Sequence, residues 1–265
     1  MEQRKRKGLK LNILFAFLSV ALMWGVWLVA YFIVQNDYVI PSFSDTVAEM
    51  GKNFISPVFW RAFANTLGRT VLAWLAAFAL AAVFASLSVL WPPLYRLFAP
   101  VVSLLRTLPT MVITLMLLIW TTPRVAPLIV CLLMIFPLAF SQITAAYRGI
   151  DLRLIEMAKV YNIPFKKKLF DIYIPLMLPD IFSQAGADLS LALKVMISAE
   201  VLSTTFRSVG GLLYEASMYS QMADMFAITI VMIAAGGLLE FLVGRLTLIT
   251  DVWVKGRSGA KGERQ

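Results

Sequence analysis

The sequence predicts an all-α membrane protein with about six transmembrane helices, and three observations support this fold class. Apolar residues make up 60% of the 265 positions and charged residues 15%, against about 45–50% and about 25% in a soluble domain. Apolar runs recur along the chain with the length of about 20 residues that a helix needs to cross the hydrocarbon core. Lysines and arginines gather at the ends of these runs, which is typical of loops that set membrane topology.

The first predicted span covers residues 11–34 and follows a basic segment at residues 1–10. A secretory signal peptide is the alternative interpretation of such a start. However, the apolar run is far longer than the roughly 7–15 residues of a signal-peptide core, and no clear cleavage motif follows it. We therefore expect a retained first helix with a cytoplasmic N-terminus.

An external loop is expected at residues 35–60, with a short helix that begins at a Ser44 or Asp45 cap. The second predicted span, residues 62–90, carries small residues at four-residue spacing along one helix face. Such a face lets the backbone of a neighbouring helix approach closely. The small residues are Ala73, Ala77, Ala81 and Ala85.

A third apolar region follows Trp91-Pro92-Pro93 and runs to Trp120. It is interrupted at residues 106–110, where Pro109 removes a helix hydrogen bond and Arg106 is costly inside the membrane. We therefore expect a broken helix, with Arg106 near the cytoplasmic interface or in a polar cavity.

The remaining predicted spans cover residues 125–147, 176–204 and 224–250. With six spans, both termini lie on the same side of the membrane, and the distribution of basic residues places that side in the cytoplasm. The expected parts are an N-terminal helix with its external loop (1–61), a core (62–250) and a cytoplasmic basic tail (251–265).

The residue inventory excludes several classes of chemistry. The chain has no histidine, which removes the commonest metal ligand and neutral-pH proton carrier. Its single cysteine, Cys131, rules out a disulfide framework, a cysteine zinc site and a Cys/His nucleophile within one chain. No GxxxxGKS/T phosphate loop is present, so ATP cannot bind by that motif. We expect no catalytic residue, metal ion or cofactor here, and topology explains the net charge of +9 better than nucleic acid does.

Residues 155–179, IEMAKVYNIPFKKKLFDIYIPLMLP, form a basic segment between the fourth and fifth spans. The pattern predicts a short helix over about Leu152–Tyr161 that ends at Asn162, since asparagine tolerates the left-handed conformation. A second helix is expected to begin near Pro164. Two interpretations stay open on this pattern alone. One is a surface hairpin whose lysines fix topology and touch anionic lipid, and the other is a helix pair that docks in a groove of a soluble partner.

This segment resembles the cytoplasmic EAA loop of the inner-membrane permeases of bacterial ABC importers. The family pattern is Glu-Ala-Ala, three residues, Gly, nine residues and Ile-x-Leu-Pro. Its spacing is matched without insertion by Glu156-Met157-Ala158, Asn162 and Ile172-Tyr173-Ile174-Pro175, although Met157, Asn162 and Ile174 replace Ala, Gly and Leu. The resemblance extends over residues 62–250, including the run LFAPVVSLLRTLP. The nearest branch contains the nitrate, sulfonate, taurine and bicarbonate permeases.

The resemblance implies a permease fold in which the two short helices form a coupling element. They would sit in a cleft of a cytoplasmic ABC ATPase dimer, which binds ATP and Mg²⁺ and drives alternating access. It also implies a second permease copy in a homodimer, an extracytoplasmic solute-binding protein and a location in the bacterial plasma (inner) membrane. The residues that it assigns to coupling are Glu156, Met157, Ala158, Asn162, Pro164, Ile172, Ile174 and Pro175.

Charged residues inside the fifth span are candidates for a substrate path. Asp188, Lys194 and Glu200 are each expensive in lipid, so they should face protein or water. One interpretation is that Lys194 attracts an anionic substrate while Glu200 serves the external gate, and the other is a structural ion pair. The candidate path residues are Arg106, Lys194, Ser198 and Glu200.

We therefore expect a transport subunit, not an enzyme, that moves a small polar or anionic solute such as a sulfonate, nitrate or taurine. An ion-gradient-driven secondary transporter is the alternative. That alternative predicts an inverted repeat and carboxylates or histidines near mid-membrane in both halves, and no repeat is seen in the sequence. An intramembrane enzyme would need clustered carboxylates or a Ser/His/Lys constellation, and none is apparent.

Overall fold

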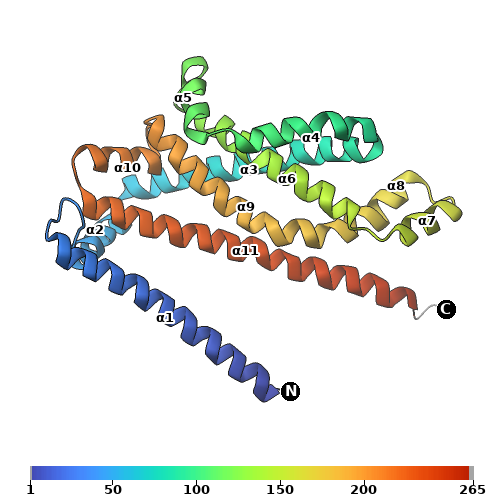
Figure 1. Cartoon of the computed structure of the whole chain (residues 1–265), viewed down its shortest axis with the longest axis horizontal. Coiled ribbons are helices and arrows are strands. Elements are labelled where there is room, and N and C mark those ends of the chain that lie inside the picture. The colour runs from blue at the N-terminus through green and yellow to red at the C-terminus, as the bar shows by residue number, and fades with distance from the viewer. Residues whose placement is uncertain (1, 263–265) are drawn as a thin grey trace. The chain divides into compact units, whose positions relative to one another are not determined.

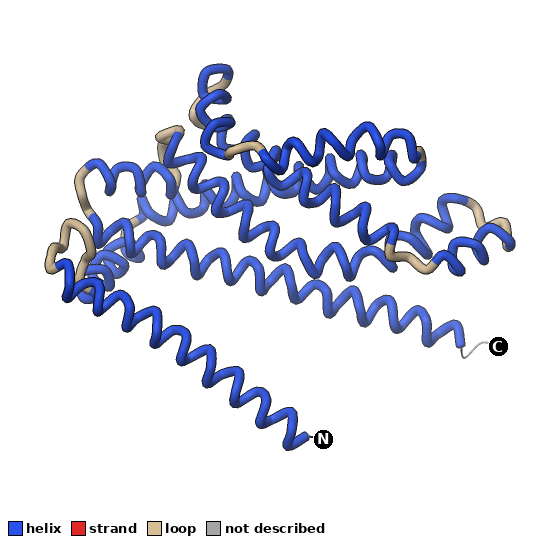
Figure 2. Tube along the Cα trace, in the orientation of Figure 1, coloured by secondary structure: helices blue, strands red, loops and turns tan. Residues whose placement is uncertain are grey.

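A computed structural model describes residues 2–262, and for residues 2–14, 16, 17, 159, 165 and 247–262 it describes the backbone alone. The part of the chain that it describes consists of helices and connecting loops, without strands (Figures 1 and 2). This confirms the predicted all-α fold. The chain forms two compact units, which are described separately: residues up to Ser56 with Glu215–Val231, and Pro57–Tyr214 with residues from Met232 onward.

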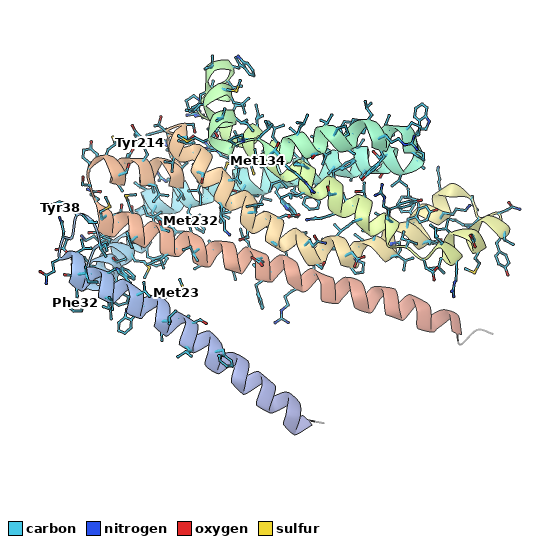
Figure 3. All side chains as sticks on the ribbon, viewed as in Figure 1. Met23, Phe32, Tyr38, Met134, Tyr214 and Met232 are labelled. Carbon is cyan, nitrogen blue, oxygen red and sulfur yellow. The ribbon has the colours of Figure 1, made fainter. Side chains whose placement is uncertain are left out.

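The first unit contains α1 (Glu2–Val34) and α2 (Phe43–Ile55). Trp27 of α1 joins the two helices, because its ring lies 5.7 Å from that of Phe43 and its Nε1 donates to the Pro41 carbonyl at 3.2 Å. Other α1 side chains, such as Met23 and Phe32, stand outward and exposed (Figure 3). This outward face is apolar, as a helix in contact with lipid requires.

The predicted helix in the external loop forms, but its cap lies earlier than expected. Ser42, not Ser44 or Asp45, is the cap residue, and its Oγ accepts the Asp45 backbone N–H at 3.1 Å. The same Oγ donates to the Asp45 carboxylate at 2.7 Å. The first bond satisfies a backbone N–H left open at the helix start and the second holds the Ser42 hydroxyl in place, which explains why the cap lies at Ser42.

The core of the second unit is built by α3 (Pro57–Leu90), α6 (Ala126–Arg148) and α9 (Ile174–Leu202). The alanine face predicted on α3 lies at the centre of this packing, and Ala77, Ala81 and Ala85 have no exposed surface. They contact α6 and α9 in two clusters that include Ile135 and Met196. The small side chains therefore serve close helix approach, as predicted.

The third apolar region is broken, as the sequence predicts. Helices α4 (Pro92–Thr107) and α5 (Thr110–Trp120) are bent by 98° with respect to each other. Between them Leu108 and Pro109 are extended, with ψ angles of 126° and 120°. Thr110 then donates from Oγ1 to the Met134 Sδ at 3.7 Å, which joins the start of α5 to α6.

A helical hairpin follows α6 and leads into α9 (Figure 1). It consists of α7 (Leu152–Val160), α8 (Phe165–Lys168) and a π-helical turn, η1 (Leu169–Tyr173). The two predicted helices are present, but the second continues through η1 into α9 without a break. Pro175 explains the wide turn, because its ring would clash with the carbonyl four residues earlier in a regular α-helix.

The chain ends with α10 (Val209–Met218) and α11 (Met222–Gly262). Among the described residues, three helices are long and apolar enough to cross a membrane: α3, α6 and the Met222–Leu246 part of α11. The α4–α5 pair makes a fourth if it is one broken span. Helix α9 has 29 residues, roughly 43 Å of helix, but its charged side chains lower its hydropathy. The described apolar part of α1, Leu18–Val34, is one of the shorter apolar helices.

The backbones of α9 and α11 lie in close contact at Gly186. A Cβ atom there would lie 2.6 Å from the Glu240 carbonyl oxygen and 3.3 Å from the Gly244 nitrogen. Both neighbours are backbone atoms, so neither can rotate away. We predict that Gly186→Ala lowers stability by about 1–3 kcal/mol through overpacking.

The check is the thermal unfolding midpoint of the detergent-purified protein. Gly68→Ala in α3 is the matched control, because nothing lies within 4 Å of the Cβ position there. That change should raise stability by up to about 1 kcal/mol through helix propensity. Equal midpoints for the two variants would contradict the close approach at Gly186.

Candidate functional site

The hairpin turns at Asn162, which has a φ of +47°. The Ile163 N–H bonds to the Ala158 carbonyl at 3.1 Å across this turn, in the pattern of a Schellman motif. A left-handed residue is required at this place, and asparagine tolerates it better than other residues with a Cβ. The prediction that Asn162 ends the first short helix is confirmed.

One face of α7 is apolar and exposed. Met157, Val160 and Tyr161 are 48%, 78% and 74% exposed, and their spacing of three and four residues places them on one side of the helix. Glu156 is exposed beside them, whereas Ala158 is buried against the protein. We call Met157, Val160 and Tyr161 the hairpin ridge. A ridge of this kind has the geometry of a docking surface.

The other predicted coupling residues lie at the base of the hairpin. Pro164 is exposed next to the turn, Ile172 and Ile174 are half-buried, and Pro175 is buried at the start of α9. The Tyr173 ring meets the Tyr147 ring of α6 edge-on at 5.5 Å. The base is therefore held between α6 and α9, while the ridge stands free.

Glu200 has no exposed surface and is held by groups from α3 and α10. Its carboxylate accepts hydrogen bonds from Thr66 Oγ1 at 2.8 Å and pairs with Arg69 Nη1 at 3.2 Å. The Gly210 N–H, in the first turn of α10, also donates to it at 3.3 Å. The positive end of a helix and a cation therefore face this buried charge together.

Two glycines allow α10 to begin beside Glu200. At Gly210 a Cβ would lie 2.3 Å from the Glu200 Cβ and 2.6 Å from the Val201 nitrogen. At Gly211 a Cβ would lie 2.3 Å from the Thr205 carbonyl oxygen. The close contact that brings the helix end to the carboxylate thus depends on these glycines.

The other predicted path residues lie apart from Glu200. Lys194 and Ser198 are exposed, whereas Glu200 is buried, and Ser198 Oγ donates to the Lys194 carbonyl at 3.0 Å. Among the described residues, Lys194 has no carboxylate oxygen within 4.0 Å. Arg106 lines a cavity between α4 and α6 and donates to the Pro137 carbonyl at 3.2 Å. Asp188 is buried within the unit.

Sequence reasoning missed the partners of Glu200. Thr66 and Arg69 precede Glu200 by more than 130 residues, at separations of 134 and 131. Nothing in the local pattern links them, because the pairing arises only when α3 packs against α9. The general rule that a charge in a span needs a protein partner does anticipate that some partner exists.

The sequence matches a known family of membrane transport components. Residues 80–255 match the family described as binding-protein-dependent transport system inner membrane component. The chain belongs to this family. It is thus an inner-membrane permease component, and the predicted resemblance to the permeases of ABC importers is confirmed.

A curated relative is the putative aliphatic sulfonates transport permease protein SsuC of Bacillus subtilis (strain 168). It is 25% identical over 145 residues, which cover 54% of this chain and 52% of the relative. The match thus spans about half the length of that permease. Similarity to this protein agrees with the sulfonate-containing branch suggested by the sequence.

Solved structures share the permease fold. Two chains from inward facing conformations of the MetNI methionine ABC transporter match with a TM-score of 0.65 and 16% identity. The first match covers 74% of this chain and 98% of that chain, and the second covers 73% and 96%. At this identity the likeness establishes the fold of the permease.

The Glu200 network generates a test of permease stability. Arg69→Met removes the cation and leaves a buried carboxylate without its ion pair, so we predict a loss of about 3 kcal/mol or more. Adding Glu200→Gln should restore part of that loss, since the amide keeps hydrogen-bonding atoms near Thr66 and Gly210 without the charge. The measurement is the thermal unfolding midpoint of the purified permease.

Arg61→Met is the control for this pair, because Arg61 lies on the same helix with an exposed side chain. It should move the midpoint by less than the change at Arg69. A double variant less stable than Arg69→Met alone would show that Glu200 is not held by that ion pair.

Proposed function

We propose that this permease is the membrane-spanning subunit of an ATP-driven importer of a small organic anion, with a sulfonate as the best supported class. ATP and Mg²⁺ would bind a separate cytoplasmic ATPase, and this chain would carry out no chemistry on the solute. A second permease copy and an external solute-binding protein would complete the assembly. The observation that carries the proposal is the exposed hairpin ridge in a chain of this family.

The ridge supports docking to a soluble partner. Apolar side chains at the end of a membrane protein gain free energy when a partner covers them, at about 25 cal/mol per Å² of apolar surface. Met157, Val160 and Tyr161 offer such surface on one helix face, flanked by the exposed Glu156. An amphipathic helix pair of this size suits a groove on the ATPase.

The base of the hairpin supports transmission of movement into the membrane. Helix α8 continues through η1 into α9, so no flexible linker separates them. Tyr173 contacts Tyr147 of α6 at the same level. Displacement of the ridge by ATPase closure would therefore act on α6 and α9 together, and we propose that this drives alternating access.

The exposed face of α9 supports an anionic solute. An ammonium group is costly against lipid, so Lys194 must face water or a second copy. Ser198 lies one turn away on the same face. The sulfonate class comes from the similarity to the Bacillus subtilis permease, which is named for the transport of aliphatic sulfonates. In this proposal Lys194 attracts the solute, while Glu200 serves the structure of the outer end.

Val160→Asp tests the docking role. A charge placed on the ridge would have to be desolvated on binding, so we expect the affinity for the cognate ATPase to fall by about tenfold or more. Affinity is measured by titrating the purified ATPase onto the permease in nanodiscs. Co-purification of the wild-type chain with that ATPase separates this proposal from a secondary transporter.

Val39→Asp is the matched control, because Val39 is also exposed and lies in the loop between α1 and α2. The same chemical change there should leave ATPase binding unaltered. Equal affinities for the wild type and both variants would remove the ridge from the coupling interface.

Lys194→Met tests whether Lys194 lies on the path of the solute. Loss of the charge should lower ATP-dependent uptake of ethanesulfonate into proteoliposomes by about tenfold, since charge-assisted contacts are the strong ones. Lys194→Arg keeps the charge and should retain most uptake. If Lys194→Met transports like the wild type while the ATPase stays bound, the path does not use this lysine.

A further inference from the structure

A cavity of about 540 Å³ lies between α4 and α6 in the second unit. Its walls are one face of each helix, with residues spaced by three and four positions. This spacing means that both helices turn a consistent stripe of side chains inward. The lining residues are Tyr95, Ala99, Val102, Ser103 and Arg106 from α4, and Phe140, Ser141, Thr144, Ala145, Arg148 and Gly149 from α6 and its end.

The cavity lining contains two arginines and no acidic residue. Among the described residues, neither Arg106 nor Arg148 has a carboxylate oxygen within 4.0 Å. The lining therefore carries two positive charges that the surrounding protein does not neutralise with an ion pair. An unneutralised pair of guanidinium groups in a cavity attracts an anion.

Both guanidinium groups are held in place by neutral partners. Arg106 donates from Nη2 to the Pro137 carbonyl at 3.2 Å. Arg148 lies over the Tyr95 ring, with its Cζ 4.1 Å from the ring centroid. A guanidinium group carries five N–H donors, so one hydrogen bond or one stacked face leaves several donors for a ligand. The site is thus positioned before any anion arrives.

Two hydroxyl groups of the lining, those of Ser141 and Thr144, already donate within α6. Ser141 Oγ donates to the Pro137 carbonyl at 2.9 Å, and Thr144 Oγ1 donates to the Phe140 carbonyl at 2.8 Å. Their protons are therefore used within α6, and the arginines supply the donors for a ligand. Bidentate arginine contacts fit the oxygens of sulfonate or phosphate groups.

The two arginines lie at different depths along the helices. Tyr95 is in the first turn of α4 and Arg148 is the last residue of α6, so this pair marks one end of the bundle. Arg106 lies about four turns from Pro92, roughly 21 Å along α4. Arg106 and Arg148 therefore lie at opposite ends of the cavity, and both side chains are exposed in the single chain.

A second hollow of about 250 Å³ continues this line toward the helix ends. It shares Tyr95, Thr144 and Arg148 with the cavity and adds Arg96. The positive lining thus runs from the end of the bundle to Arg106. A soluble oxyanion and a lipid phosphate share the negative charge that this lining attracts, and the lipid arm of the experiment distinguishes them.

We propose that this arginine cavity is a binding site for a small sulfonate-type oxyanion, with Arg148 at its mouth and Arg106 at its inner end. The inference rests on the proposed function, because it takes the anion to be the transported solute. The site lies on a single chain and is separate from the Lys194 face. It would hold the solute on the cytoplasmic side of the path.

The test uses the permease–ATPase complex in phosphatidylcholine nanodiscs, without a solute-binding protein, and ethanesulfonate as the probe. Binding is read from the rise in unfolding temperature with ethanesulfonate concentration. We expect saturable binding to the wild type, and about a tenfold or larger increase in the half-saturating concentration for Arg106→Gln and for Arg148→Gln. Arg106→Lys keeps the charge, so its half-saturating concentration should lie between those of the glutamine variants and the wild type. Unfolding temperatures equal to that of the wild type without ligand would show that the variants fold.

Arg124→Gln is the control for charge removal, because Arg124 is exposed in the loop between α5 and α6 and is not among the cavity residues. It should bind like the wild type. Absence of ethanesulfonate binding, or equal binding by Arg106→Gln, overturns the proposal. Stabilisation by added phosphatidylglycerol alone, lost in the arginine variants, also overturns it and assigns the cavity to a lipid head group.

The proposed function fails separately from this site. ATP-dependent uptake of ethanesulfonate by the wild-type complex with its solute-binding protein is measured in parallel. Normal uptake with no arginine-dependent binding rejects the cavity alone. Binding to the arginines without any uptake supports the site and rejects sulfonate import as the function.

Discussion

Close contact between helix backbones, made possible by the alanine face of α3, is the constraint on which the second unit depends. Lipid tails are as apolar as the side chains, so helices in a membrane gain little by burying apolar surface against each other. Their association relies on dense packing, and Ala77, Ala81 and Ala85 let α6 and α9 come near enough for it. Because those residues have no exposed surface, enlarging any of them would separate the helices.

This packing sorts the polar side chains of the membrane region into two groups. Glu200 points into the core, where Thr66, Arg69 and the start of α10 satisfy it. Lys194 and Arg106 are exposed. Among the described residues, neither has a carboxylate oxygen within 4.0 Å. The same helices thus hold one charge buried among partners and leave other charges exposed, and the proposed solute sites use the exposed ones.

Much of this architecture was predictable, because its signals are local. The break at Pro109, the alanine spacing and the turn at Asn162 each follow from the conformational limits of one or a few neighbouring residues. The division of the hairpin into an exposed ridge and a base packed against α6 was not predictable from spacing, since it depends on contacts such as that between Tyr173 and Tyr147.

Distant pairings were out of reach for the sequence alone. Arg69 and Glu200 carry no shared pattern, and only the fold brings them to 3.2 Å. The arginine cavity is a similar case, because Arg106 stood out as a charge in an apolar run while Arg148 did not. Arg148 lines the same cavity as Arg106 because one face of α4 lies opposite one face of α6.

The π-helical turn at η1 has a consequence for the orientation of the hairpin. Such a turn amounts to one residue inserted into an α-helix, and one residue corresponds to about 100° of rotation about the helix axis. The azimuth at which the hairpin leaves α9 is therefore set by a single residue between Leu169 and Tyr173. A permease that lost that residue would keep its membrane helices but aim its hairpin in another direction, away from the ATPase that we propose it contacts.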